Sequence, residues 1–201
     1  MFGGDAAAVV ADPETDLIAH FKQVAVDQTS AQRRPFDLAE VVGEVVLTLR
    51  PQFKATPYRI EVDIPPGIDM DSFPGPLGQV LTNLVNNALL HGFAGLPAGV
   101  VRIAAEAQGD RVRIQVADNG RGIAPEHQSR VFDPFFTTRL GQGGSGLGLH
   151  IVYSIVTRVL GGRIDLASQP GEGTEITLEI PVIAPQQEVD EAHSAMSVAK
   201  A

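Results

Sequence analysis

Apolar residues recur every three or four positions in three stretches of the chain, which is the spacing of one face of an α-helix. The stretches are residues 16–33, 37–49 and 76–91. Residues 146–160 are largely apolar, which predicts a buried helix. Asp37 stands before the second stretch with Glu40 three residues later, a capping-box pattern, and Pro51 is expected to end that helix.

Polar and apolar residues alternate in residues 58–64, which is the period of a β-strand. Four further segments are predicted strands: 100–107, 111–118, 163–168 and 174–181. The short turns 108–110 and 169–173 join these four into two antiparallel hairpins. Because helices and strands interleave along the chain, we predict an α+β fold, a two-layer α/β sandwich whose mixed sheet is covered by helices on one face.

Length and composition narrow the class of protein. With 201 residues, the chain is long enough for one domain with a proper core and an appendage. A net charge of −9 without a cluster of Lys and Arg argues against a nucleic-acid partner. The lack of cysteine excludes disulfides and thiolate metal sites and fits a reducing compartment. No apolar run approaches the roughly twenty residues that span a bilayer. We therefore expect a cytoplasmic location without direct membrane contact by this chain, and membrane anchoring of a larger parent protein stays open.

We divide the chain into four parts. They are a flexible N-terminus at 1–14, a helical segment at 15–35, a compact domain at 36–183 and a disordered polar tail at 184–201. The apolar seam of residues 16–34 is too short to form a stable helix by itself. It needs a partner, either the same segment of a second copy, as in a homodimer, or another helix.

Asn83 and Asn87 lie four residues apart in the third predicted helix, which places both amides on one face, one turn apart. Each amide offers a carbonyl acceptor and an NH2 donor, so the pair can hold a hard metal ion or hydrogen-bond phosphate oxygens. An isolated pair of this kind is more typical of a polar outer helix face. Three later motifs favour the ligand site instead.

The motif DNGRGI, residues 118–123, stands where a strand ends. A carboxylate there can accept a hydrogen bond from an exocyclic amine, and glycines let backbone lie against a ring, although alone the motif indicates only a turn. Residues 132–139 place three Phe within five positions, typical of a loop anchor or a lid hinge. Residues 141–149 are glycine-rich and run into a helix, where backbone N–H groups can meet phosphates. No Lys-Ser or Lys-Thr follows, so this is not a Walker loop.

Together and in this order, the four motifs resemble the nucleotide-binding motifs of the Bergerat ATPase superfamily, most closely those of sensor histidine kinases. NLVNNALLH resembles their asparagine box, DNGRGI the first glycine box, FDPFFTTR the phenylalanine box, GGSGLGLHIVY the second glycine box and GEGT the short terminal motif. The resemblance covers residues 36–181 and implies the Bergerat ATP-binding fold. It also implies that residues 16–35 are the end of a dimerisation helical hairpin.

The resemblance implies a site for ATP and Mg²⁺. In that site Asn87 ligates the metal, and Asn83 contacts the metal or the phosphates. Asp118 binds the adenine amino group, and Thr174 supports it through water. The other expected nucleotide-binding residues are His91, Gly120, Gly122, Ile123, Phe136, Thr138, Arg139, Gly144, Ser145, Gly146, Leu147 and Gly148.

The resemblance implies a mobile lid at residues 137–145. At one position of the site this chain differs from the family pattern. Many of these kinases place a Lys three residues after the metal-binding Asn, where this chain has Leu90. A phosphate contact from that position is therefore left to His91 or Arg139.

The implied reaction is transfer of the γ-phosphoryl group of MgATP to a histidine, with a response regulator and a histidine-bearing dimerisation domain as partners. In the family an acidic residue follows the acceptor histidine. The histidines here are His20, His91, His127, His150 and His193, and none has that context. We therefore expect the acceptor outside this chain, His150 packed, and His127 at the surface. Two alternatives stay open: a protein-serine kinase of the same superfamily acting in trans, and a non-catalytic dimeric adaptor.

Overall fold

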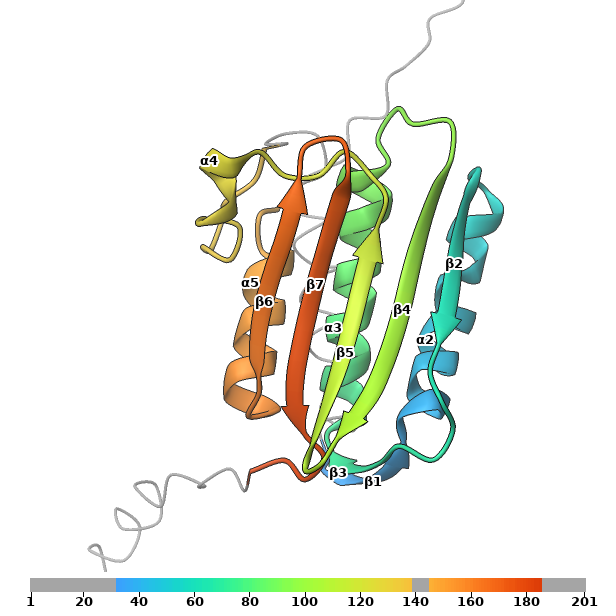
Figure 1. Cartoon of the computed structure of the whole chain (residues 1–201), viewed down its shortest axis with the longest axis vertical. Coiled ribbons are helices and arrows are strands. Elements are labelled where there is room, and N and C mark those ends of the chain that lie inside the picture. The colour runs from blue at the N-terminus through green and yellow to red at the C-terminus, as the bar shows by residue number, and fades with distance from the viewer. Residues whose placement is uncertain (1–31, 139–144, 186–201) are drawn as a thin grey trace, which may run out of the picture.

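The computed structural model describes residues 32–138 and 145–185. They form two layers, in which helices cover one face of a five-stranded sheet (Figure 1). The strand order is β2-β4-β5-β7-β6; β2 and β4 run parallel, and the other neighbours are antiparallel. The bounds are Tyr58–Asp63 for β2, Gly99–Gln108 for β4, Arg111–Asp118 for β5, Arg163–Gln169 for β6 and Gly173–Pro181 for β7. The predicted α+β fold with a mixed sheet is confirmed.

The helical layer consists of α2, α3 and α5, with the single turn α4 between β5 and α5. Their bounds are Leu38–Lys54 for α2, Pro74–Asn87 for α3, Pro125–Gln128 for α4 and Gly148–Ser154 for α5. α3 continues into a wider π-helical turn at Ala88–Gly92, and α5 into another at Ile155–Val159. The helices predicted at 76–91 and 146–160 are therefore present, each with a change of winding in its last turn. Turns of this kind occur often at functional sites.

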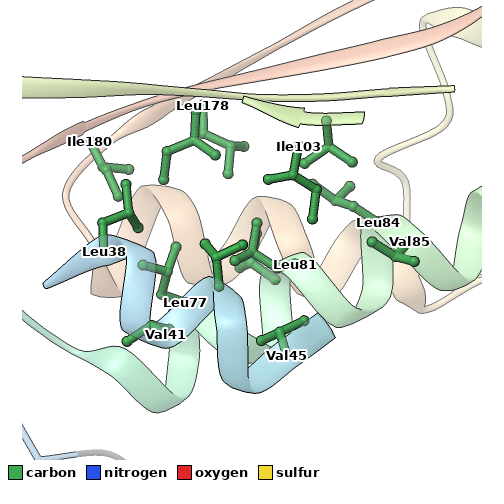
Figure 2. Packing of buried hydrophobic residues seen from close by; sticks show 14 of the residues in the cluster. Leu38, Val41, Val45, Leu77, Leu81, Leu84, Val85, Ile103, Leu178 and Ile180 are labelled. Atoms are coloured by element: carbon green, nitrogen blue, oxygen red, sulfur yellow. The ribbon is translucent and has the colours of Figure 1, made fainter. Parts of the chain in front are cut away.

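The core lies between the two layers, where apolar side chains from helices and strands interdigitate (Figure 2). Leu77, Leu81 and Val85 of α3 are fully buried. They belong to one cluster with Ile103 of β4 and Leu178 of β7, which are equally buried. The apolar stripe read from the sequence is thus the face that α3 turns to the core, which orients the amides beside it.

Helix α2 begins where the sequence predicts and ends later. The Asp37 carboxylate accepts a hydrogen bond from the Ala39 N–H at 2.7 Å and another from the Gly67 N–H at 2.9 Å. Pro51 does not end the helix, which continues to Lys54. That prediction is wrong because Leu49 and Phe53, four residues apart, are both buried in the core. Burying Phe53 offsets the hydrogen bond that proline removes from the last turns.

Replacing Asp37 with alanine should destabilise the domain by about 1–2 kcal/mol, because it removes the helix cap and the bond to Gly67 together. For a domain of this size the melting temperature should fall by roughly 2–8 °C. Thermal unfolding measures it. Glu44→Ala, which removes an exposed carboxylate from the middle of the same helix, is the control and should change little. Equal effects of the two changes would contradict the capping role.

A second, two-stranded sheet pairs β1 (Arg34–Asp37) with β3 (Asp69–Ser72). Arg33 holds it from the side: its Nε and Nη2 donate to the two carboxylate oxygens of Asp71 at 3.0 and 2.8 Å, which lowers the pKa of Asp71. Neither strand was predicted, because each has four residues and no extended alternation. Arg34 and Pro35, assigned to the end of the helical segment, are therefore in a strand.

The chain after β7 stays with the domain for a few residues. The Ala184 N–H donates to the Asp71 carbonyl at 2.9 Å, and Ala184 is buried. The predicted tail at 184–201 therefore includes a residue that packs on the domain, and its remainder, 186–201, lies outside the described residues. The N-terminal part at 1–14 and the helical segment up to residue 31 lie outside them too. Among the described helices, none has the length and apolar content needed to cross a bilayer.

Candidate functional site

A cavity of about 450 Å³ lies among α3 and its π-helical turn, the adjoining ends of β5 and β7, α4, and the start of α5. This volume is within the range of roughly 300–1,000 Å³ typical of small-molecule sites. Most of the residues predicted for ligand binding line it: Asn83, Asn87, His91, Asp118, Gly122, Ile123, Phe136, Thr138, Ser145, Gly146, Gly148 and Thr174. Residues from five separate sequence motifs therefore meet in one cavity.

Asn87 is the most informative side chain of the helical wall. Its Nδ2 atom is buried and has no hydrogen-bond partner among the described residues. Gly148, the first residue of α5, faces its Oδ1 atom, and a Cβ added there would lie at an ordinary contact distance of 3.5 Å. A buried amide without a partner costs roughly 1–3 kcal/mol. A polar ligand that enters this cavity can recover that energy.

Asp118, the last residue of β5, is a second polar residue of the cavity lining. Its Oδ1 accepts a hydrogen bond from the Gly120 N–H at 2.8 Å. Burial raises the pKa of Asp118 above its ordinary value, and the backbone N–H groups of Gly120 and Thr174 oppose that rise. Gly92 leaves room for the carboxylate, since a Cβ there would lie 3.1 Å from Oδ1. The cavity lining thus includes a half-buried acidic group and a buried amide.

The two glycines of the DNGRGI loop allow the loop backbone to pack directly against the backbone of other segments. A Cβ on Gly122 would lie 1.9 Å from the Gln169 carbonyl oxygen, and one on Gly120 would lie 2.5 Å from that of Gly92. Gly120 is buried and is not a lining residue of the cavity. The sequence interpretation places both glycines against a ring of the ligand, but only Gly122 lines the cavity. Gly120 instead lets the loop pack on Gly92, the last residue of the π-helical turn that follows α3.

The structure adds lining residues that sequence reasoning assigned elsewhere. His127, expected at the surface, is half-buried and lines the cavity, with its ring centroid 5.5 Å from that of Phe136. Arg130 lies over the same Phe136 ring at 4.8 Å. Ile176, two positions beyond Thr174 on β7, also lines the cavity. Strand alternation could have placed Ile176 beside Thr174, but His127 carries no signal in the sequence beyond its place between two motifs.

The remaining predicted residues have other positions. Leu147 is not among the lining residues. Arg139 and Gly144 lie outside the described residues, as does the whole segment 139–144 of the predicted lid. His150 is half-buried, as expected, with its Nδ1 3.1 Å from the Phe132 carbonyl oxygen.

Comparison with known proteins identifies this architecture. The family model of histidine kinase-, DNA gyrase B- and HSP90-like ATPases matches residues 74–184. The solved catalytic domain of the histidine kinase ThkA is 30% identical, with a TM-score of 0.65, over 76% of this chain and 97% of that one. The chain belongs to this ATPase family. Its fold is that of the catalytic domain of sensor histidine kinases, so the predicted family is confirmed.

Curated relatives give the same class. The alginate biosynthesis sensor protein KinB of Pseudomonas aeruginosa is 34% identical over 73% of this chain and 24% of its own length. The sensor histidine kinase ZraS of Escherichia coli K12 is 42% identical over 60% of this chain and 24% of its own length. The chain thus spans about a quarter of the length of these relatives. Which residues of the ATPase domain bind the nucleotide stays a prediction.

Replacing Asp118 with asparagine should weaken ATP binding and stabilise the free domain. Losing a carboxylate acceptor for the adenine amine should weaken binding by about ten- to a hundredfold. Burial raises the pKa of Asp118, so its contribution to stability is present at low pH and is lost as pH rises through that raised pKa. At neutral pH the Asp118→Asn variant, whose side chain is uncharged, should therefore melt higher than wild type, and the difference should shrink as pH falls.

Calorimetric ATP titration and thermal unfolding across pH measure the two effects. Asp165→Asn, at an exposed carboxyl group of β6 that does not line the cavity, is the control and should leave both unchanged. Wild-type ATP affinity in the Asp118 variant would contradict its role.

Proposed function

We propose that this chain binds MgATP in the cavity and transfers the γ-phosphoryl group to a histidine of a dimerisation helix, as the ATP-binding catalytic region of a two-component sensor kinase. The observation that carries the proposal is the buried amide of Asn87, which lacks a hydrogen-bond partner in the described part of the chain and lies in the same cavity as Asp118. A nucleotide has a donor-bearing base for one end and charged phosphates for the other.

The base end is formed by Asp118, Thr174 and Gly92. A carboxylate accepts hydrogen bonds and suits the exocyclic amine of adenine. Ile123 and Ile176 supply apolar walls for the ring. The phosphate end is formed by Asn83, Asn87 and the segment that enters α5, with Ser145, Gly146 and Gly148 in the lining.

The site fits a hard divalent cation at Asn87. A carbonyl oxygen is a ligand that Mg²⁺ accepts, and the metal keeps its other coordination positions for phosphate oxygens and water. Asn87 would hold the ion, with Asn83 one turn away toward the metal or the phosphates. When bound, Mg²⁺ neutralises charge on the transferring group. The two amides would position and orient the phosphate groups, and positioning is most of what phosphoryl transfer requires of a protein.

The acceptor histidine nitrogen attacks the γ-phosphorus, the bond from that phosphorus to the β–γ bridging oxygen breaks, and ADP leaves. None of the five histidines in the sequence has the acceptor context. Of these, His150 is fixed near the Phe132 carbonyl, and His91 and His127 line the cavity. We therefore place the acceptor on a dimerisation helix supplied from outside residues 32–185, and a response regulator as the next recipient of the phosphoryl group. Such a kinase domain works in the cytoplasm.

The proposal is tested by incubating the chain with radiolabelled MgATP, alone and with the dimerisation hairpin of a related sensor kinase. We expect saturable ATP binding, no self-labelling, and acid-labile label on the added hairpin. Acid-stable label would indicate a protein-serine kinase, and failure to bind ATP would indicate a non-catalytic adaptor. Robust self-labelling abolished by His20→Ala would place the acceptor inside the chain and contradict the proposal on that point.

A further inference from the structure

A row of three polar side chains crosses the sheet at the base end of the cavity. The register pairs Asp118 of β5 with Thr174 of β7, and Thr174 with Ser168 of β6. Asp118 and Thr174 line the cavity, whereas Ser168 stands behind Thr174 as its neighbour. The sequence motifs include the first two residues and leave Ser168 without a role.

The hydroxyl of Ser168 has three polar contacts. Its Oγ accepts a hydrogen bond from the Ile123 N–H at 2.9 Å. It lies 2.8 Å from the Gly173 carbonyl oxygen and 3.0 Å from Oγ1 of Thr174. A serine hydroxyl has one proton and two lone pairs, and a carbonyl oxygen can only accept. The Ser168 proton therefore goes to Gly173, since otherwise two oxygens would stand 2.8 Å apart with no proton between them.

This assignment decides the direction of the bond to Thr174. The Ser168 hydroxyl donates its proton to the Gly173 carbonyl and uses one lone pair to accept from the Ile123 N–H. Its second lone pair remains, so toward Thr174 it can only accept a hydrogen bond. The single proton of Thr174 therefore points away from the cavity, and Oγ1 presents only lone pairs to whatever lies inside. Asp118, as a carboxylate, is likewise an acceptor. The base end thus consists of two acceptors side by side.

Ser168 is held in this position from two sides. Gln128 of α4 donates from Nε2 to the Ser168 carbonyl and to the Ile123 carbonyl, each at 2.9 Å. The Gly171 N–H donates to the Arg121 carbonyl at 2.7 Å. These bonds tie the β6–β7 turn to the DNGRGI loop, so the Ser168 hydroxyl has little freedom to turn toward other partners.

We propose that Ser168 is a positioning residue that sets base specificity: by taking the proton of Thr174, it fixes a pair of acceptors that selects a 6-amino purine over a 6-oxo purine. The group that meets Thr174, either the base or a bridging water, must then donate. The oxygen of a 6-oxo purine would face two acceptors. This inference rests on the proposed function, since it requires that a nucleotide base occupies this end of the cavity.

The experiment compares the affinities of ATP and ITP, which carry an amino group and an oxo group at the same ring position, by calorimetric titration of the whole chain. Wild type should prefer ATP. Ser168→Ala frees the Thr174 proton to donate into the cavity, so the ATP-to-ITP preference should fall by about five- to tenfold. Ser168→Thr, which keeps the hydroxyl, should restore the wild-type preference.

A Thr174→Val background separates this role from a structural one. Without a hydroxyl at position 174, Ser168→Ala should produce no further change in the preference. Equal weakening of ATP and ITP by Ser168→Ala, or the same change of preference in the Thr174→Val background, would overturn the inference while leaving the proposed function standing. Should Ser168→Ala unfold, Ser168→Cys, a near-isosteric weak acceptor, takes its place. Wild type that binds neither nucleotide would overturn the proposed function itself.

Discussion

Replacing Asn87 with alanine is expected to lower phosphoryl transfer by at least about a hundredfold while leaving the free domain as stable as wild type or slightly more stable. The two effects have one cause. The Nδ2 atom is buried without a hydrogen-bond partner among the described residues, so removing this atom costs the free domain no hydrogen bond there. The complex with MgATP loses the group that we place on the metal.

The measurements are acid-labile labelling of an added dimerisation hairpin, thermal unfolding without nucleotide, and ADP titration with and without Mg²⁺. Asn87→Ala should abolish the gain in affinity that Mg²⁺ provides and leave metal-free ADP binding nearly unchanged. Gln79→Ala removes an amide two turns earlier on α3, away from the cavity, and is the matched control. Labelling at the wild-type rate by the Asn87 variant would place the metal elsewhere.

Replacing Gly122 with alanine should destabilise the domain by at least about 3 kcal/mol, and its melting temperature should fall by roughly 6–12 °C. Gly122 has a φ of 68°, in the left-handed region, where a side chain costs about 1–2 kcal/mol. Its Cβ would also lie 1.9 Å from the Gln169 carbonyl oxygen. Backbone cannot yield there without separating the DNGRGI loop from the β6–β7 turn.

Gly109→Ala is the matched control for this change. Gly109 has a φ of 65° in the β4–β5 turn, and a Cβ there would meet no atom within 4 Å. This variant should therefore lose only the conformational part, about 1–2 kcal/mol. Urea or thermal unfolding of the two variants separates the cost of a side chain at positive φ from the cost of the collision with the Gln169 carbonyl oxygen. Equal losses would show that the contact with Gln169 relaxes at no cost.

Local patterns in the sequence determined most of the elements. Helical spacing located the stripe of Val80, Leu81 and Val85 that α3 buries, and the short turns located both hairpins. The motifs likewise predicted Asn87, Asp118 and Thr174, which line one cavity. These features depend on residues close in sequence, whose periodicity reports which face is buried.

Tertiary structure decided what depends on distant residues. β1 and β3 are short strands that pair with each other, and Asp71 of β3 also hydrogen-bonds to the segment after β7. Pro51 stays helical because Phe53 packs in the core. The lining role of His127 arises because α4 returns to the cavity after β5.

The direction of the Thr174 hydroxyl was also beyond the sequence. It depends on Ser168, Ile123 and Gly173, which come from different segments and meet only when β6, β7 and the DNGRGI loop are assembled. Periodicity tells which face of an element is buried, but a hydrogen bond requires atoms within about 3 Å of each other. That proximity is supplied by packing between segments. The sequence by itself therefore determined which groups are candidates for the base end that we propose, and the fold decided which of them accept hydrogen bonds.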